Sequence, residues 1–107
     1  MSALYRFLSG VVVAAALLAQ GDRGVITGRV TDRGNATIPG VHVTATHTST
    51  NVQYKASTSE SGEFNLPSLP VGVYRVLIEQ AGFKSAVHAQ VQLESGSTAR
   101  LDTMLEG

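Results

Sequence analysis

The stretch SESGEFNLPSLPVGVYRVLIEQAGF, residues 59–83, alternates between short apolar segments and tight turns. Ser61-Gly62 is a turn signal, and Leu69-Pro70-Val71-Gly72 places proline and glycine together at a corner. Residues 64–66 and 73–79 carry an apolar side chain at every second position, which is the period of a half-buried strand. The stretch therefore predicts strands joined by turns, and it contains neither a nucleophile with a base nor a metal-ligand cluster.

Residues 22–107 continue this pattern and predict one all-β domain. Apolar residues recur at every second position in segments bounded by glycine, proline, serine and asparagine. We predict seven strands, at residues 25–32, 41–47, 52–58, 63–66, 73–79, 87–93 and 98–105. Short strands separated by turns favour an antiparallel, two-sheet β-sandwich of the immunoglobulin-like kind, and a small β-barrel is the competing architecture.

The strand patterns also predict which side chains are buried. Apolar residues on both faces of strand 73–79 are typical of a central strand. The residues of strand 87–93 expected to point inward are Val87, Ala89, Val91 and Leu93. The large residues expected in the core are Phe64, Leu66, Leu69, Tyr74, Val76, Ile78 and Phe83. A buried Tyr74 needs a hydrogen-bond partner, which we expect to be a backbone group at the sheet edge. Pro39 and Pro70 are expected outside the strands.

Residues 1–21 have the pattern of a secretory signal peptide. One positive charge, Arg6, precedes an uninterrupted run of twelve apolar or small residues at positions 7–18. This run is shorter than the about 20 apolar residues that a membrane-spanning helix needs. We therefore predict a helical signal peptide cleaved before Asp22, with cleavage after Ala19 as an alternative. An uncleaved anchor and a buried core helix are the competing interpretations.

The composition excludes several classes of function. The chain has no cysteine, which excludes lipid attachment through a cysteine, a disulfide framework and a cysteine zinc site. Without Arg6, seven basic and eight acidic side chains remain, for a formal charge of −1. The two signs are interspersed, so nothing in the sequence indicates nucleic-acid binding. An exported domain without disulfides favours a bacterial envelope.

Three segments, ITGRVTDRGNATIPGVHVTA, TSESGEFNLPSLPVGVYRVLIEQAGF and VQLESGSTARLD, resemble the carboxypeptidase regulatory-like domain. The markers are Gly28 and Val30 before Asp32 and Gly34; Pro39-Gly40 before Val41 and Val43; Gly62 before Phe64 and Leu66; Leu69, Gly72 and Tyr74; and Gly82-Phe83. The resemblance covers residues 25–105 and implies a transthyretin-like, seven-stranded sandwich. Gly62 and Gly72 are expected where turns need a positive φ angle or a close backbone approach. Glu60 stands where the family commonly has an aspartate.

The resemblance implies an accessory, non-catalytic module. In the family, this domain follows the catalytic domain of certain metallocarboxypeptidases, or sits directly after the signal peptide of TonB-dependent outer-membrane receptors. The second setting resembles this chain, because the predicted signal peptide runs straight into the first strand. We expect an exported interaction or spacer module, in the periplasm, at the outer membrane or secreted. Its expected partner is an envelope protein or a downstream receptor barrel, so the chain is either a fragment of such a receptor or a free-standing module. Contacts are expected through loops 33–39 and 94–97 or through an edge strand.

No residue pattern indicates an enzyme, a cofactor or a metal site. His42 and His47 are an odd number of residues apart on one strand and so point to opposite faces. His88 lies on another strand, and all three histidines are expected to be solvated. No serine has a nucleophile-elbow motif. Asn35-Ala36-Thr37 is a formal glycosylation sequon, which means little in a bacterial protein.

Carbohydrate binding is the main alternative function, and an accessory domain of a metallocarboxypeptidase is the second. The fold resembles those of starch-binding-like modules, which is an analogy of architecture. Sugar sites present exposed aromatic rings, and the aromatic residues after residue 21 are Tyr54, Phe64, Tyr74 and Phe83. Since the other three are expected in the core, Tyr54 is the residue predicted to make a weak ligand contact.

Overall fold

The structure is a computed structural model that describes residues 22–107. The predicted signal peptide, residues 1–21, lies outside the described residues. Within the part described, no helix is long and apolar enough to cross a membrane. The strands are β1 (Arg23–Thr31), β2 (His42–His47), β3 (Gln53–Ser57), β4 (Glu63–Pro70), β5 (Gly72–Glu79), β6 (Ala86–Leu93), β7 (Thr98–Arg100) and β8 (Thr103–Met104).

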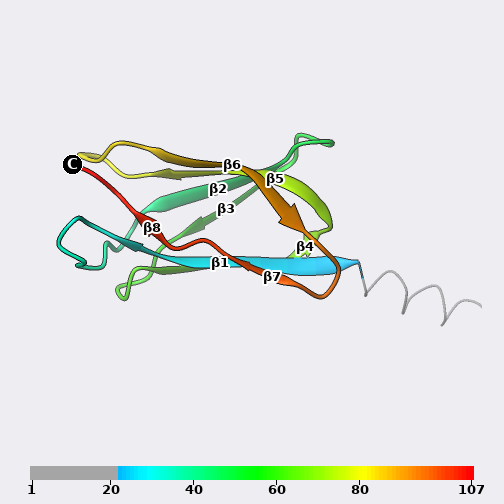
Figure 1. The fold of residues 1–107 in the computed structure, drawn as a ribbon, viewed down its shortest axis with the longest axis horizontal. Helices are drawn as coiled ribbons and strands as arrows, with labels where there is room; N and C mark the ends of the chain where they lie inside the picture. The colour runs from blue at the N-terminus through cyan, green and yellow to red at the C-terminus, as the bar shows by residue number, and fades with distance from the viewer. Residues whose placement is uncertain (1–21) are drawn as a thin grey trace, which may run out of the picture.

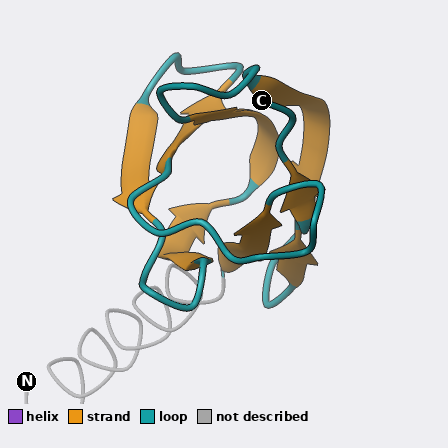
Figure 2. Ribbon diagram, turned by 90° about the vertical axis from the view of Figure 1, so that its left-hand side faces the viewer, coloured by secondary structure: helices purple, strands orange, loops and turns teal. Residues whose placement is uncertain are grey.

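The strands form two sheets that face each other, as Figures 1 and 2 show. One sheet has the order β4-β1-β7, and β8 also pairs with β1; the other has the order β3-β2-β5-β6. β5 pairs antiparallel with both β2 and β6, as predicted for a central strand. The all-β sandwich is confirmed, and the separate sheets distinguish it from a barrel.

The last predicted strand differs from the prediction in two ways. It is divided into β7 and β8, and both pair with β1 in parallel rather than antiparallel. The division falls at Leu101 and Asp102, where the Asp102 side chain accepts a hydrogen bond from the amide of Arg29 at 3.0 Å. The amide of Arg29 thus bonds a side-chain oxygen at this point, where a regular sheet would have a backbone carbonyl. The other sheet is antiparallel throughout, as predicted.

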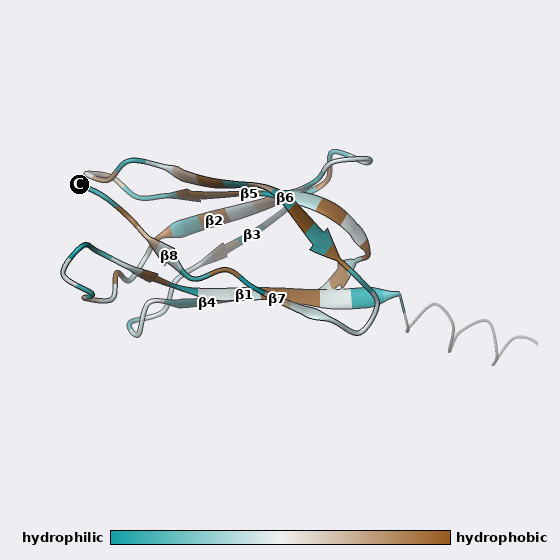
Figure 3. Ribbon diagram, viewed as in Figure 1, coloured by the Kyte–Doolittle hydropathy of each residue, from teal (hydrophilic) through white to brown (hydrophobic). Residues whose placement is uncertain are grey.

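The core lies between the sheets, and the apolar positions in Figure 3 are concentrated on the strands. Six of the seven predicted core residues are at most 5% exposed: Phe64, Leu66, Leu69, Tyr74, Val76 and Ile78. The expectation that Phe83 lies in the core is wrong, because this residue is only partly buried against the core residues. It lies in the β5–β6 turn, where its amide donates to the carbonyl of Gln80 at 3.1 Å, so its ring sits at the rim of the core.

The inward face of β6 was predicted only in part. Val91 and Leu93 are buried, but Val87 is 44% exposed and Ala89 is exposed. The reason is a β-bulge: Tyr74 pairs with Val91 and Val76 with His88, so three steps along β6 match two along β5. One extra residue moves every side chain before the bulge to the other face.

Proline and glycine positions were predicted with one exception. Gly62 and Gly72 have φ angles of 76° and 143°, and a Cβ atom on Gly62 would lie 2.7 Å from the Val30 carbonyl oxygen. Pro39 lies outside the strands, but Pro70 is the last residue of β4 and pairs with Arg23. Proline is tolerated there because β4 is an edge strand and Pro70 is its last residue.

Candidate functional site

His47 is buried, which corrects the expectation that all three histidines are solvated. Its side chain is 8% exposed, and its Nε2 lies 3.0 Å from the carbonyl oxygen of Val71. A carbonyl can only accept, so Nε2 donates this bond, and Nδ1 faces the Ser49 hydroxyl at 3.0 Å. Gly72 makes the approach possible, because a Cβ atom at that position would collide with the imidazole.

Tyr74 lies beside this histidine and completes what we call the corner cluster, made of His47, Pro70, Gly72 and Tyr74. The two rings meet edge to face with centroids 5.0 Å apart. The Tyr74 hydroxyl donates to the carbonyl oxygen of Pro70 at 2.5 Å, which is the backbone partner predicted for it. Burial, with a smaller contribution from Tyr54, raises the pKa of Tyr74 to about 12, while Arg23 opposes the shift. The phenol therefore remains a protonated hydrogen-bond donor at neutral pH.

The contact between Ser49 and His47 is a serine–imidazole pair that sequence reasoning missed. The serine is exposed and stands in the β2–β3 turn, two residues after the buried histidine. In a nucleophilic triad the second imidazole nitrogen donates to a carboxylate, which stabilises the imidazolium. Here it donates to a backbone carbonyl, so the imidazole is bound as a structural bridge between two turns. Among residues 22–107, no group of three histidine, aspartate or glutamate side chains could hold a metal ion.

Tyr54, the predicted ligand contact, is half-buried on β3. Its ring packs against the hydrophobic core, and its centroid lies 6.2 Å from the centroid of the Tyr74 ring, at an interplanar angle of 64°. Part of the aromatic surface is therefore occupied by the protein itself. The exposed remainder lies on an edge strand of the β3-β2-β5-β6 sheet.

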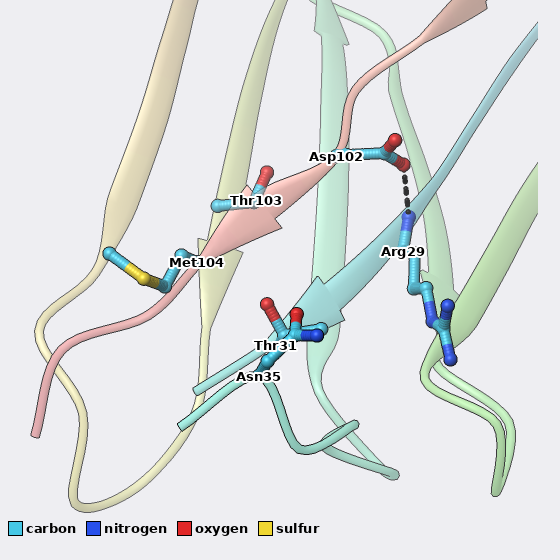
Figure 4. Close-up of a pocket in the computed structure, with 6 residues that line it drawn as sticks. All are labelled: Arg29, Thr31, Asn35, Asp102, Thr103 and Met104. Carbon is cyan, nitrogen blue, oxygen red and sulfur yellow. Dashed lines mark hydrogen bonds between the residues drawn. The ribbon is translucent and has the colours of Figure 1, made fainter. Parts of the chain in front are cut away.

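A hollow of about 330 Å³ lies beside β8, at the point where the last strand is divided (Figure 4). Its lining residues are Arg29, Thr31, Asn35, Asp102, Thr103 and Met104. Asp102 points at the amide of Arg29 and also binds Nε of Arg100 at 3.2 Å, whereas the Arg29 guanidinium extends away from it. We call this hollow the polar groove. Its hydroxyl, amide and charged groups suit a polar ligand. One of the lining hydroxyls, that of Thr103, contacts Nε2 of His88 at 2.9 Å.

The two loops predicted as contact sites do not form one surface, because they lie at opposite ends of the sandwich (Figure 1). Loop 33–39 is held by Asp32, whose Oδ1 accepts from the amides of Gly34 and Ala36 at 2.9 and 3.0 Å. Turn 94–97 is closed by the Ser97 hydroxyl, which donates to the Glu94 carbonyl at 2.7 Å. Both are ordered by their own hydrogen bonds, so each can present a fixed surface.

The chain belongs to the carboxypeptidase regulatory-like domain family, whose model matches residues 25–106. It is 34% identical over 103 residues to the TonB-dependent transporter Oar of Myxococcus xanthus. This match covers 91% of the chain but only 10% of the transporter. The chain thus corresponds in length to a small part of that relative.

Solved structures with different functions have the same fold. The Bacillus anthracis TIE protein matches with a TM-score of 0.69 and 23% identity, over 80% of this chain and 17% of that one. A 3-chlorocatechol 1,2-dioxygenase from Rhodococcus opacus matches with a TM-score of 0.62 and 13% identity, over 80% and 60%. A putative carbohydrate-binding protein from Bacteroides uniformis matches with a TM-score of 0.64 and 15% identity, over 79% and 42%. These likenesses show the fold alone, because one architecture supports many functions.

Proposed function

We propose that this chain is a non-catalytic, exported β-sandwich module of the bacterial cell envelope. It acts as an interaction or spacer domain and forms the N-terminal extension of a TonB-dependent receptor. The observation that carries this proposal is the 34% identity to the transporter Oar across 91% of the chain. The partner is the receptor barrel or another envelope protein.

Two features of the domain support a spacer without catalysis. β1 starts at one end of the sandwich and the C-terminal segment leaves at the other, so the length of the sandwich separates the two ends of the domain (Figure 1). Two of the three buried polar side chains bond backbone carbonyls: His47 bonds Val71, and the Thr58 hydroxyl donates to Ile38 at 2.7 Å. The hydroxyl of the third, Thr103, contacts Nε2 of His88 at 2.9 Å. These groups are engaged in holding the fold.

Cell fractionation tests this proposal. An antibody raised against residues 22–107 should detect, in cells that express the native gene, a protein far larger than 11.2 kDa in the outer-membrane fraction. Sequencing of the transcript beyond the Gly107 codon should show a continuing frame with many alternating strands. A band of about the size of the domain, found only in the culture medium, would contradict the receptor assignment. An upstream catalytic domain in the same frame would instead support the accessory module of a metallocarboxypeptidase.

Carbohydrate binding is the second candidate function, favoured by the half-exposed Tyr54 ring and by the likeness to the Bacteroides uniformis protein. It predicts that soluble glycans shift the amide resonances around Tyr54 and that Tyr54→Ala abolishes the shifts. Val52→Ala is the matched control, because Val52 is 46% exposed and immediately precedes the same strand. Glycan titrations without any shift would exclude this candidate.

A further inference from the structure

The first and last strands of the described chain lie side by side and point in the same direction. β1 pairs in parallel with β7 from Val25 to Thr27 and with β8 from Val30 to Thr31. We call this contact, between β1 and residues 96–105, the terminal seam. Figure 1 shows that the chain enters the seam at one end of the sandwich and leaves it at the other.

Hydrogen bonds are distributed along the whole terminal seam. They include bonds from the amides of Gly96 to the Arg23 carbonyl (2.8 Å), Val25 to Ser97 (3.0 Å), Leu101 to Thr27 (2.7 Å) and Leu105 to Thr31 (2.8 Å). At the division between β7 and β8, the Asp102 carboxylate accepts from the amide of Arg29 at 3.0 Å. The seam is therefore bonded even where the last strand is interrupted.

Both sides of the terminal seam are also attached to the rest of the domain. β1 pairs on its other side with β4, from Arg23 to Arg29. The C-terminal segment is held by the bond from the Lys84 amide to the Glu106 carbonyl at 2.7 Å, by the fully buried Leu105 and by the 2.9 Å contact between His88 Nε2 and the Thr103 hydroxyl. The two sides of the seam can therefore slide apart only if at least one of them also loses its contacts with the rest of the domain.

We propose that the domain resists tension applied along its chain, and that the terminal seam is the element that carries the force. A pull on residues 23 and 106 acts along two parallel strands from opposite ends, so it slides them past each other. Sliding loads all the seam hydrogen bonds together, whereas peeling loads them one after another. A single hydrogen bond contributes little to the barrier against forced unfolding. The barrier rises when all the bonds must break at the same time. This inference rests on the proposed spacer function, in which the domain transmits tension between the segments it joins.

Single-molecule pulling on the full chain tests this mechanism through two attachment geometries. Since the chain has no cysteine, pairs introduced at exposed positions attach handles without ambiguity. The pair Arg23→Cys and Glu106→Cys shears the terminal seam, and the pair Arg23→Cys and Ser95→Cys peels the same seam from one end. The unfolding force should be several-fold higher in the shearing geometry at the same loading rate. Equal forces in the two geometries would overturn the proposal.

A pair of aspartate variants locates the resistance. Asp102→Ala removes the acceptor of the Arg29 amide inside the seam, and Asp32→Ala removes the acceptor of two loop amides outside it. Only Asp102→Ala should lower the shearing force, and it should leave the peeling force nearly unchanged. Equal losses from both variants would show general destabilisation and contradict the seam assignment. The force contrast belongs to the folded domain, so it does not depend on the outcome of the cell fractionation that tests the proposed function.

Discussion

The corner cluster and the polar groove differ in how completely their polar groups are engaged. In the corner cluster the Tyr74 hydroxyl and Nε2 of His47 both donate to backbone carbonyls, and the two rings are almost without exposure. In the polar groove Asp102 and Thr103 are hydrogen-bonded, but the Arg29 side chain is exposed and its guanidinium extends away from Asp102. A buried polar group that loses its partner lowers the free energy of unfolding more than an exposed group does, so the corner cluster should matter more for stability than the exposed Arg29 side chain of the polar groove.

The largest expected effect is that of removing the Tyr74 ring from the corner cluster. Tyr74→Ala should lower the free energy of unfolding by about 3–5 kcal/mol, because it leaves a cavity beside His47 and unpairs the Pro70 carbonyl. Thermal or denaturant unfolding measures the loss. The control is Val87→Ala on β6, where the side chain is 44% exposed and the change should be within about 1 kcal/mol. An unchanged melting temperature for Tyr74→Ala would contradict the structural role of the cluster.

High pH should weaken the same cluster. Burial raises the pKa of Tyr74 to about 12 from an ordinary value of 10.0, so its stabilising effect is complete below pH 10 and is lost as the pH rises toward 12. The loss should be on the order of 2–3 kcal/mol, measured by denaturant unfolding as a function of pH. Tyr74→Phe should remove this part of the pH dependence. Parallel decreases in the two proteins would show that the Tyr74 phenol is not the cause.

A smaller effect is expected at the rim of the corner cluster. Ser49→Ala removes the hydroxyl that faces Nδ1 of His47, which should cost about 0.5–1.5 kcal/mol in denaturant unfolding. Ser85→Ala is the matched control, since Ser85 is an exposed serine in the β5–β6 turn. Peptide hydrolysis should be absent in the parent chain and in both variants. Hydrolysis that Ser49→Ala abolishes would make the serine–imidazole pair a catalytic site.

The smallest effect should come from the polar groove. Arg29→Ala changes an exposed side chain that extends into solvent, so the free energy of unfolding should change by no more than about 0.5 kcal/mol. Denaturant unfolding measures this change, and Asp102→Ala is the comparison. Asp102→Ala should cost more than Arg29→Ala, because the Asp102 carboxylate accepts from the Arg29 amide and binds Arg100. A larger loss from Arg29→Ala than from Ser49→Ala would reverse the contrast between groove and cluster.

The parts of the molecule that could be predicted from the sequence depend on nearby residues. Tyr74 and its acceptor Pro70 are four residues apart, and Gly72 between them indicates the turn they span. Strands could be predicted in the same way, because the alternation of apolar and polar residues lies within each strand. The family resemblance implied the same sandwich that the strand pattern favoured; the two sheets confirm the sandwich, and the family match over residues 25–106 confirms the resemblance.

The features that could not be predicted depend on registers set between distant segments. The bulge in β6 has no signal in residues 86–93, because it reflects the pairing with β5. The polar groove joins Arg29 to Asp102, which are 73 residues apart, through the parallel pairing of β1 with β7 and β8. The position of His47 required a carbonyl at Val71 and space left by Gly72, which strand parity alone does not provide.

The bulge in β6 also bears on whether the edges of the sheets can pair with other chains. Outer strands invite pairing with other chains, and proteins discourage it with charged residues, prolines or irregular backbone. Lys55 lies on β3, and Pro67 and Pro70 lie on β4, whereas β6 (AVHAQVQL) has neither a charged residue nor a proline. On β6 the extra residue between His88 and Val91 is therefore the remaining interruption of a regular template. Deleting Ala89 would straighten that edge and favour aggregation at high expression.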